Sequence, residues 1–211
     1  MVQSFNPYSN KECYYIVAKE LVESNFNPKG AQIPLEEYKP SDKIVPYKII
    51  GNALKGKDLV GLKYKQLLPW IAPEENTMFV ISGDFVSTED GTGIVHIAPT
   101  FGADDAKVAK DAHIPSLFLI NKKGETRPMV DLEGKYYLLD DLDDNFRKAC
   151  VAESEYAKHA GEYVKNAYDP QFNVNGYDEK TASKAEDLNI RLCMEMKQAG
   201  IVLRIEKHVH N

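Results

Sequence analysis

Apolar residues in roughly the first two thirds of the chain come in short runs separated by glycine, proline and polar turns. β-Branched and aromatic residues dominate these runs, which favours strands over helices. The pattern predicts strands over residues 13–18, 47–51, 77–81, 85–87, 94–98 and 116–120. A helical turn is expected at 19–23, and the prolines from Pro28 to Pro46 indicate an extended connector. Short strands at this spacing predict a mostly antiparallel, β-barrel-like core.

The pattern changes after about residue 138. The acidic run Leu139–Asp144 is placed to open a helix through Asn145 to Ser154, because the helix dipole favours acids in the first turn. A longer helix is expected over Glu179 to Ala199, with Gly200 as its stop, and a final strand over Ile201–Lys207. The whole predicts an α+β fold in one domain, 1–211, with a β-rich core at about 12–138 and 201–207 and a helical part at about 139–199.

Composition places the chain among ordinary globular proteins, with 211 residues, 43% hydrophobic and 27% charged. No apolar run is long enough to span a bilayer, and the start has no signal-peptide pattern. The three cysteines are far apart and fit reduced thiols, so a cytoplasmic protein without a membrane partner is expected. The net charge of −6 argues against non-specific nucleic-acid binding but allows a local basic surface.

The most unusual stretch runs from Asp90 to Asp105. Glycines on both sides of Thr92 allow a tight turn and a close backbone approach to a ligand. The following run predicts a strand that ends at Pro99, and a helix with acids in its first turn comes next. His96, Asp104 and Asp105 are therefore expected to converge on one glycine-lined hollow.

Simpler interpretations exist for each of these residues. The glycine-flanked turn can be an ordinary hairpin, Asp104 an N-cap, and His96 a hydrogen-bonded core histidine. Trp70 and Tyr64 are expected to be core aromatics. His208 and His210 could share one face of a strand, but no third ligand is near in sequence, so no metal site is assigned.

Three segments resemble a known family. Gly91–His96, Ala98–Pro99 and Phe101–Asp105 together look like the signature of the editing domain inserted into class I isoleucyl-tRNA synthetases. The leucyl and valyl enzymes have methionine and lysine where this chain has His96, so the isoleucyl family is the closer one. The second similar segment runs from Glu155–Gly161 through Ala167–Phe172, and the third is the ending, Ile205–His210.

The resemblance implies post-transfer editing, the hydrolysis of valyl-tRNA(Ile). A missing methylene in an apolar pocket is worth only about 1–3 kcal/mol, a limit for which isoleucyl enzymes facing valine are the standard example. By resemblance the catalytic residues are Asp105, which would hold the α-amino group of the valine, and His96, which would fix the terminal adenosine. Water would attack the ester with help from the ribose hydroxyl, without a serine or cysteine nucleophile. The expected substrate-binding residues are Gly91, Thr92, Gly93, Phe101 and Asp104.

The implied partners are the tRNA(Ile) 3′ end carrying mischarged valine and the remainder of the synthetase. No cofactor is expected in this chain, although the parent enzyme uses ATP and Mg. The family's threonine-rich strand, the other wall of the editing pocket, is absent from these residues, as are ATP-binding signatures. The chain therefore looks like a fragment, with no synthetic site and with weak or no hydrolysis on its own. Two alternatives are a non-catalytic tRNA 3′-end or aminoacyl-binding module and a structural insert.

Overall fold

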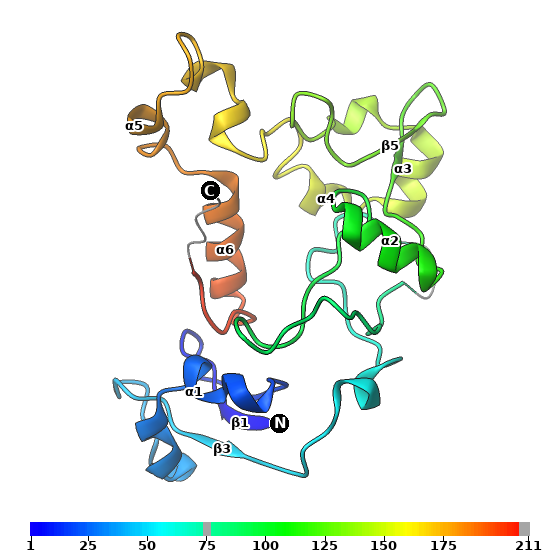
Figure 1. The fold of residues 1–211 in the computed structure, drawn as a ribbon. Helices are drawn as coiled ribbons and strands as arrows, with labels where there is room; N and C mark the ends of the chain where they lie inside the picture. Colours follow the sequence, from blue (N-terminus) through cyan, green and yellow to red (C-terminus); the bar gives the residue numbers. More distant parts are fainter. Residues whose placement is uncertain (74–76, 207–211) are drawn as a thin grey trace. The chain divides into compact units, whose positions relative to one another are not determined.

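The chain divides into two compact units, each with its own core. This computed structural model describes residues 1–73 and 77–206, which Figure 1 traces as a ribbon. Unit one comprises Met1–Asp58, Gly83–His96 and Leu192–Asn211, and unit two comprises Leu59–Ser82 and Ile97–Arg191. The expected division into a β-rich core and a helical part stays a prediction.

Unit one contains a three-stranded antiparallel sheet with strand order β2-β1-β3. The strands are β1 Val2–Phe5, β2 Glu12–Tyr15 and β3 Tyr47–Ile49. The last two confirm expected strands, although both are shorter than predicted. β1 was not predicted, because its central Ser4 is polar yet fully buried. The Ser4 hydroxyl donates to the Pro46 carbonyl oxygen at 2.7 Å, which satisfies the buried group.

The sheet of unit one packs against a short helical segment. Val2 and Tyr47 from the sheet meet Val22 and Phe26 in a buried cluster, with ring centroids of Phe26 and Tyr47 5.2 Å apart. The predicted helical turn at 19–23 is confirmed, and the predicted connector contains short 3₁₀ turns. The helical elements that lie in or begin in this unit are η1 Lys19–Leu21, α1 Val22–Asn25, η2 Pro28–Gln32, η3 Leu35–Glu37 and η4 Gly56–Leu59.

The regular secondary structure of unit two is mostly short helices, and its described residues hold one small hairpin, in which β4 Leu119–Ile120 pairs antiparallel with β5 Thr126–Arg127. Its helical elements are α2 Ala103–Asp111, η5 Leu139–Asp141, α3 Asp144–Cys150, α4 Glu153–Tyr156, η6 Asn166–Tyr168, η7 Pro170–Phe172 and α5 Glu179–Ala182. α6 Leu188–Gln198 begins in unit two and ends in unit one.

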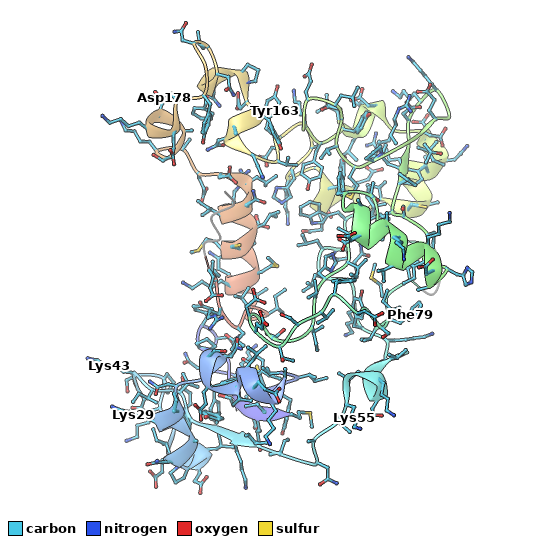
Figure 2. The ribbon with its side chains drawn as sticks, in the orientation of Figure 1. Lys29, Lys43, Lys55, Phe79, Tyr163 and Asp178 are labelled. Atoms are coloured by element: carbon cyan, nitrogen blue, oxygen red, sulfur yellow. The ribbon has the colours of Figure 1, made fainter. Side chains whose placement is uncertain are left out.

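Aspartates cap two of the short helices of unit two, α3 and α5. The Asp143 carboxylate accepts from the backbone N–H groups of Asn145 and Phe146 at 3.0 and 2.9 Å, so the acidic run opens α3 as expected. Asp178, labelled in Figure 2, caps α5 by accepting from the N–H of Lys180 at 3.0 Å.

The core of unit two centres on Trp70, which is 6% exposed as the sequence predicted. Its ring stacks on His159 with centroids 4.6 Å apart and meets Tyr136 edge-on at 5.9 Å. The backbone around the tryptophan is also paired, since the N–H of Ala152 donates to the Trp70 carbonyl at 2.9 Å. Tyr64, the other expected core aromatic, is 48% exposed, so that prediction is wrong.

The α+β class is confirmed, but the barrel-like core is not. In the described part of the chain the strands are two to four residues long, and they form two small sheets and no closed barrel. No strand forms at 85–87, 94–98 or 201–206, and 77–81 makes only an isolated bridge between Phe79 and Lys63. β-Branched composition does not make a strand where no neighbouring strand supplies a ladder.

The single long helix predicted over 179–199 is also wrong. It is divided into α5 and α6, because the Asp187 carboxylate accepts from the N–H of Asn189 at 2.9 Å and so begins a new helix. Among residues 1–73 and 77–206, no helix has the length and apolar character needed to cross a membrane.

Candidate functional site

The Gly91-Thr92-Gly93 turn lies in unit one and is held by two residues, one before α1 and one at its end. Gly91 and Gly93 have φ values of +64° and +79°, a region that favours glycine. The Gly91 carbonyl accepts from the Asn25 side-chain amide at 2.8 Å, and the Thr92 carbonyl accepts from the Ala18 N–H at 2.8 Å. The turn is therefore anchored through its backbone and not through a hairpin ladder.

Gly93 is required by space as well as by conformation. A Cβ on Gly93 would come within 2.7 Å of the Ala18 Cβ, whereas a Cβ on Gly91 would meet nothing within 4 Å. Both glycines therefore have a positive φ, but only Gly93 lacks the space for a side chain.

We expect Gly93→Ala to destabilise unit one more than Gly91→Ala does. The positive φ costs each alanine about 1–2 kcal/mol, and only the Gly93 variant must also push Ala18 away. Chemical denaturation of the two variants measures the difference directly. Equal losses would contradict the close approach of the turn to Ala18.

His96 follows the turn and is exposed, as are Ile94 and Val95. Within the described residues, residues 94–97 make no backbone–backbone hydrogen bond, and the His96 ring has no hydrogen-bond partner. The Ile94 carbonyl accepts from the Thr92 hydroxyl at 3.3 Å. The predicted strand over 94–98 is therefore wrong, and so is the alternative of a buried core histidine. The imidazole remains free to contact a ligand.

Asp105 lies in the first turn of α2, in unit two, and is half-buried. Its Oδ2 accepts from the Ala98 N–H at 3.0 Å. A Cβ on Gly102 would come within 2.7 Å of the same oxygen, so the glycine gives the carboxylate room. The N–H groups of Phe101 and Gly102 both donate to the Ala98 carbonyl, at 3.0 and 3.1 Å. Asp105 therefore braces the turn that leads into α2.

Asp104 and Phe101 are both exposed, the phenyl ring at 64%. The N-cap of α2 is Gly102, which makes no side-chain cap, so the alternative of Asp104 as N-cap is wrong. Asp104 instead follows as the second residue of the helix, where the dipole favours an acid.

The predicted site residues divide between the two units. Gly91, Thr92, Gly93 and His96 belong to unit one, whereas Phe101, Asp104 and Asp105 belong to unit two. Their convergence on one hollow stays a prediction. Sequence reasoning missed Ala18 and Asn25, since nothing in residue type or spacing links them to a turn about seventy positions later.

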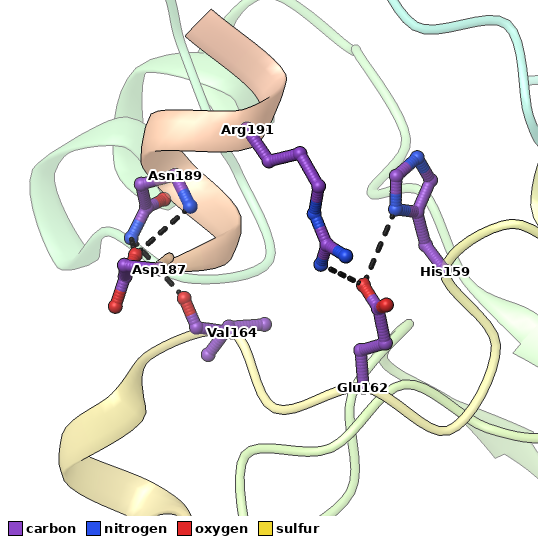
Figure 3. A network of polar contacts seen from close by, with 6 residues as sticks. All are labelled: His159, Glu162, Val164, Asp187, Asn189 and Arg191. Carbon is purple, nitrogen blue, oxygen red and sulfur yellow. Dashed lines mark hydrogen bonds and ion pairs between the residues drawn. The ribbon is translucent and has the colours of Figure 1, made fainter. Parts of the chain in front are cut away.

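A second polar cluster lies in unit two, within and beyond one of the segments singled out by the sequence (Figure 3). His159 is 3% exposed, and its Nδ1 lies 3.3 Å from the Glu162 Oε2, which also accepts from Arg191. Burial and the Glu162 carboxylate raise the pKa of Tyr136. The Asn189 amide donates to the Val164 carbonyl at 3.1 Å. This cluster ties the first turn of α6 to the loop after α4.

No group of three or more histidine, cysteine, aspartate or glutamate side chains in the described ranges could hold a metal ion. His208 and His210, considered above as a pair on one strand face, lie outside the described residues.

Comparison with known proteins establishes the relationship of this chain. No family model matches it. It is 54% identical over 222 aligned residues to the isoleucine–tRNA ligase of Bacteroides thetaiotaomicron, an alignment that covers 100% of this chain and 19% of the relative. The chain is homologous to a segment of isoleucine–tRNA ligases. The ligases of Porphyromonas gingivalis and Cytophaga hutchinsonii are 49% and 41% identical to it, each over 100% of this chain and 18% of the relative.

The expected similarity to isoleucyl-tRNA synthetases is thereby confirmed over the whole chain. The chain spans about a fifth of the length of these ligases. In this chain, the glycine-flanked turn and the Asp105 turn are the elements from which a function can be proposed.

Proposed function

We propose that this chain is the editing part of an isoleucine–tRNA ligase and that, within the full-length ligase, it hydrolyses the ester of valyl-tRNA(Ile). Two observations together support the proposal. All of this chain aligns with part of the isoleucine–tRNA ligases, and the chain contains the motif from Gly91 to Asp105. Valine lacks one methylene of isoleucine, and that difference changes binding to an apolar pocket by only about 1–3 kcal/mol. Hydrolysis of the valyl ester at a second site adds the discrimination between the two amino acids that binding does not supply.

Asp105 binds the α-amino group of the mischarged valine. One carboxylate oxygen is used by the Ala98 N–H, and the other has no partner in the described part of the chain. A half-buried carboxylate fixed by the backbone is well suited to an ammonium group, because a charge-assisted contact is stronger than a neutral one.

His96 and the glycine-flanked turn contact the RNA end and line the pocket. The exposed imidazole holds the terminal adenosine or its ribose, and the Gly91-Thr92-Gly93 backbone approaches the ester closely because it has little side chain. Phe101 and Asp104, both exposed, complete the substrate contacts.

The reaction is hydrolysis by water. Its oxygen attacks the ester carbonyl carbon, the bond from that carbon to the ribose oxygen breaks, and the released proton passes to the ribose oxygen with help from the neighbouring hydroxyl. The products are valine and uncharged tRNA. No protein nucleophile and no resident cofactor takes part, while ATP and Mg serve the synthetic site elsewhere in the ligase.

The partners are the 3′ end of tRNA(Ile) and the rest of the ligase. Unit one carries exposed lysines, and lysine is a residue type that neutralises phosphate; Lys29, Lys43 and Lys55 are labelled in Figure 2. With a net charge of −6, the chain receives only the end of an RNA that is held mainly by other parts of the ligase.

The test compares deacylation of valyl-tRNA(Ile) by the full-length ligase carrying this sequence with deacylation by the 211-residue chain alone. We expect hydrolysis by the full-length ligase and little or none by the chain alone, which lacks a threonine-rich pocket wall. A full-length ligase that binds valyl-tRNA(Ile) without hydrolysing it would replace the proposal with a binding module. If the isolated chain hydrolysed valyl-tRNA(Ile) as fast as the full-length ligase does, the threonine-rich segment would not be needed for hydrolysis.

A further inference from the structure

The backbone of the glycine-flanked turn is fixed by one short segment of unit one. Its two consecutive carbonyls, of Gly91 and Thr92, accept from Asn25 and Ala18 at 2.8 Å each. Gly93 then lies so close to Ala18 that no Cβ fits between them. Three successive residues of the turn are thus held by residues 18–25, and Asn25 makes the only one of these contacts that uses a polar side chain.

This anchoring determines which polar groups the turn offers a ligand. Its carbonyls at Gly91 and Thr92 are occupied, whereas within the described residues no acceptor meets the N–H groups of Gly91, Thr92 or Gly93. The turn therefore presents backbone donors. Fixed donors near a reacting ester stabilise the charge that develops on its oxygen, provided that their positions do not move.

We propose that Asn25 is a positioning residue for ester hydrolysis, acting through the Gly91 carbonyl to keep the donor groups of the turn in place. The inference rests on the proposed editing function. Asn25 does not touch the substrate, so its loss is expected to lower the rate of the chemical step more than the binding of the tRNA. A misplacement of about 1 Å at a reacting centre can cost on the order of 100-fold in rate.

The α1 helix provides a matched control. The Asn25 amide donates to the Leu21 carbonyl at 2.8 Å as well as to Gly91, and the Ser24 hydroxyl donates to the same Leu21 carbonyl at 2.9 Å. Ser24→Ala therefore removes a bond to Leu21 from the same helix, together with the long 3.5 Å contact from the Asn25 amide to the Ser24 hydroxyl, and leaves the bond from Asn25 to the turn in place. Asn25→Asp keeps the size of the side chain but replaces the donor to Gly91 by an oxygen, which repels the carbonyl.

The experiment measures kcat and KM for hydrolysis of valyl-tRNA(Ile) by the full-length ligase, together with amide hydrogen exchange over residues 90–96. We expect Asn25→Asp to lower kcat by about tenfold to 100-fold, to leave KM within about twofold, and to speed exchange in the turn. Ser24→Ala is expected to match the unchanged ligase in all three measurements, and both variants should charge tRNA with isoleucine normally.

The remaining outcomes separate a failure of the role of Asn25 from a failure of the editing function. Hydrolysis at the normal rate by Asn25→Asp overturns the role of Asn25 and leaves the editing function standing. Equal losses in both variants assign the effect to α1 as a whole and overturn the positioning role. If the unchanged ligase does not hydrolyse valyl-tRNA(Ile), the proposed function is wrong and the inference falls with it.

Discussion

Trp70→Ala is expected to lower the free energy of unfolding of unit two by about 3–5 kcal/mol, the usual cost of removing a large aromatic side chain from a core. Trp70 is 6% exposed, and its ring contacts both His159 and Tyr136. The variant loses this buried area and the ring contacts of Trp70 with His159 and Tyr136. Because whole domains are stable by only about 5–15 kcal/mol, this single change threatens the folding of the unit.

Urea denaturation followed by far-ultraviolet circular dichroism measures the loss, since Trp70 is the one tryptophan in the sequence and its removal also removes the fluorescence signal. Trp70→Phe retains a ring against His159 and should cost less. Leu132→Ala is the surface control, because Leu132 is fully exposed and should stay within about 0.5 kcal/mol of the unchanged protein. A loss at Trp70 no larger than at Leu132 would show that the aromatic cluster does not stabilise unit two.

Asp105→Asn should lower kcat/KM for hydrolysis of valyl-tRNA(Ile) by about tenfold to 100-fold, because a hydrogen bond to a charged group contributes about 1.5–3 kcal/mol. Asparagine keeps an oxygen that can accept from the Ala98 N–H, which Asp105 binds at 3.0 Å. The turn into α2 is therefore expected to survive while the negative charge is lost. The substitution separates recognition of the ammonium group from the structural role of the side chain.

Asp144→Asn is the matched control for this charge. Asp144 is exposed and lies in the first turn of α3 in the same unit, as Asp105 lies in the first turn of α2. We expect the control to hydrolyse valyl-tRNA(Ile) at the normal rate. If Asp105→Asn also does so, while Asp105→Ala only lowers stability by the roughly 0.5–2 kcal/mol of a lost cap, Asp105 is a structural residue and the chain is better described as a structural insert.

Local signals in the sequence predicted helix starts better than they predicted strands. Acids followed by helix-forming residues located α2 and α3, because a cap depends on residues within one turn. The apolar run at 94–98 has a composition that favours a strand, but it pairs with no other strand. A strand requires a partner that lies elsewhere in the chain, and composition does not reveal whether that partner exists.

In the candidate site too, the sequence predicted features that depend on neighbouring residues but missed contacts between residues far apart in the chain. The need for glycine at positions 91 and 93 was readable from the sequence and is confirmed by their positive φ values. The anchoring of their backbone by Asn25 was not, because the two contacting groups are separated by 66 positions. The brace from Asp105 to Ala98 was also missed, since a carboxylate in a first helical turn is usually assigned to the dipole alone.

The most direct test of the editing function is the accumulation of valyl-tRNA(Ile) when the full-length ligase is supplied with valine, ATP and tRNA(Ile). We predict that the unchanged ligase accumulates almost none, because the ester is hydrolysed as it forms, and that Asp105→Asn accumulates it while charging isoleucine normally. Equal accumulation by the two proteins would contradict the account.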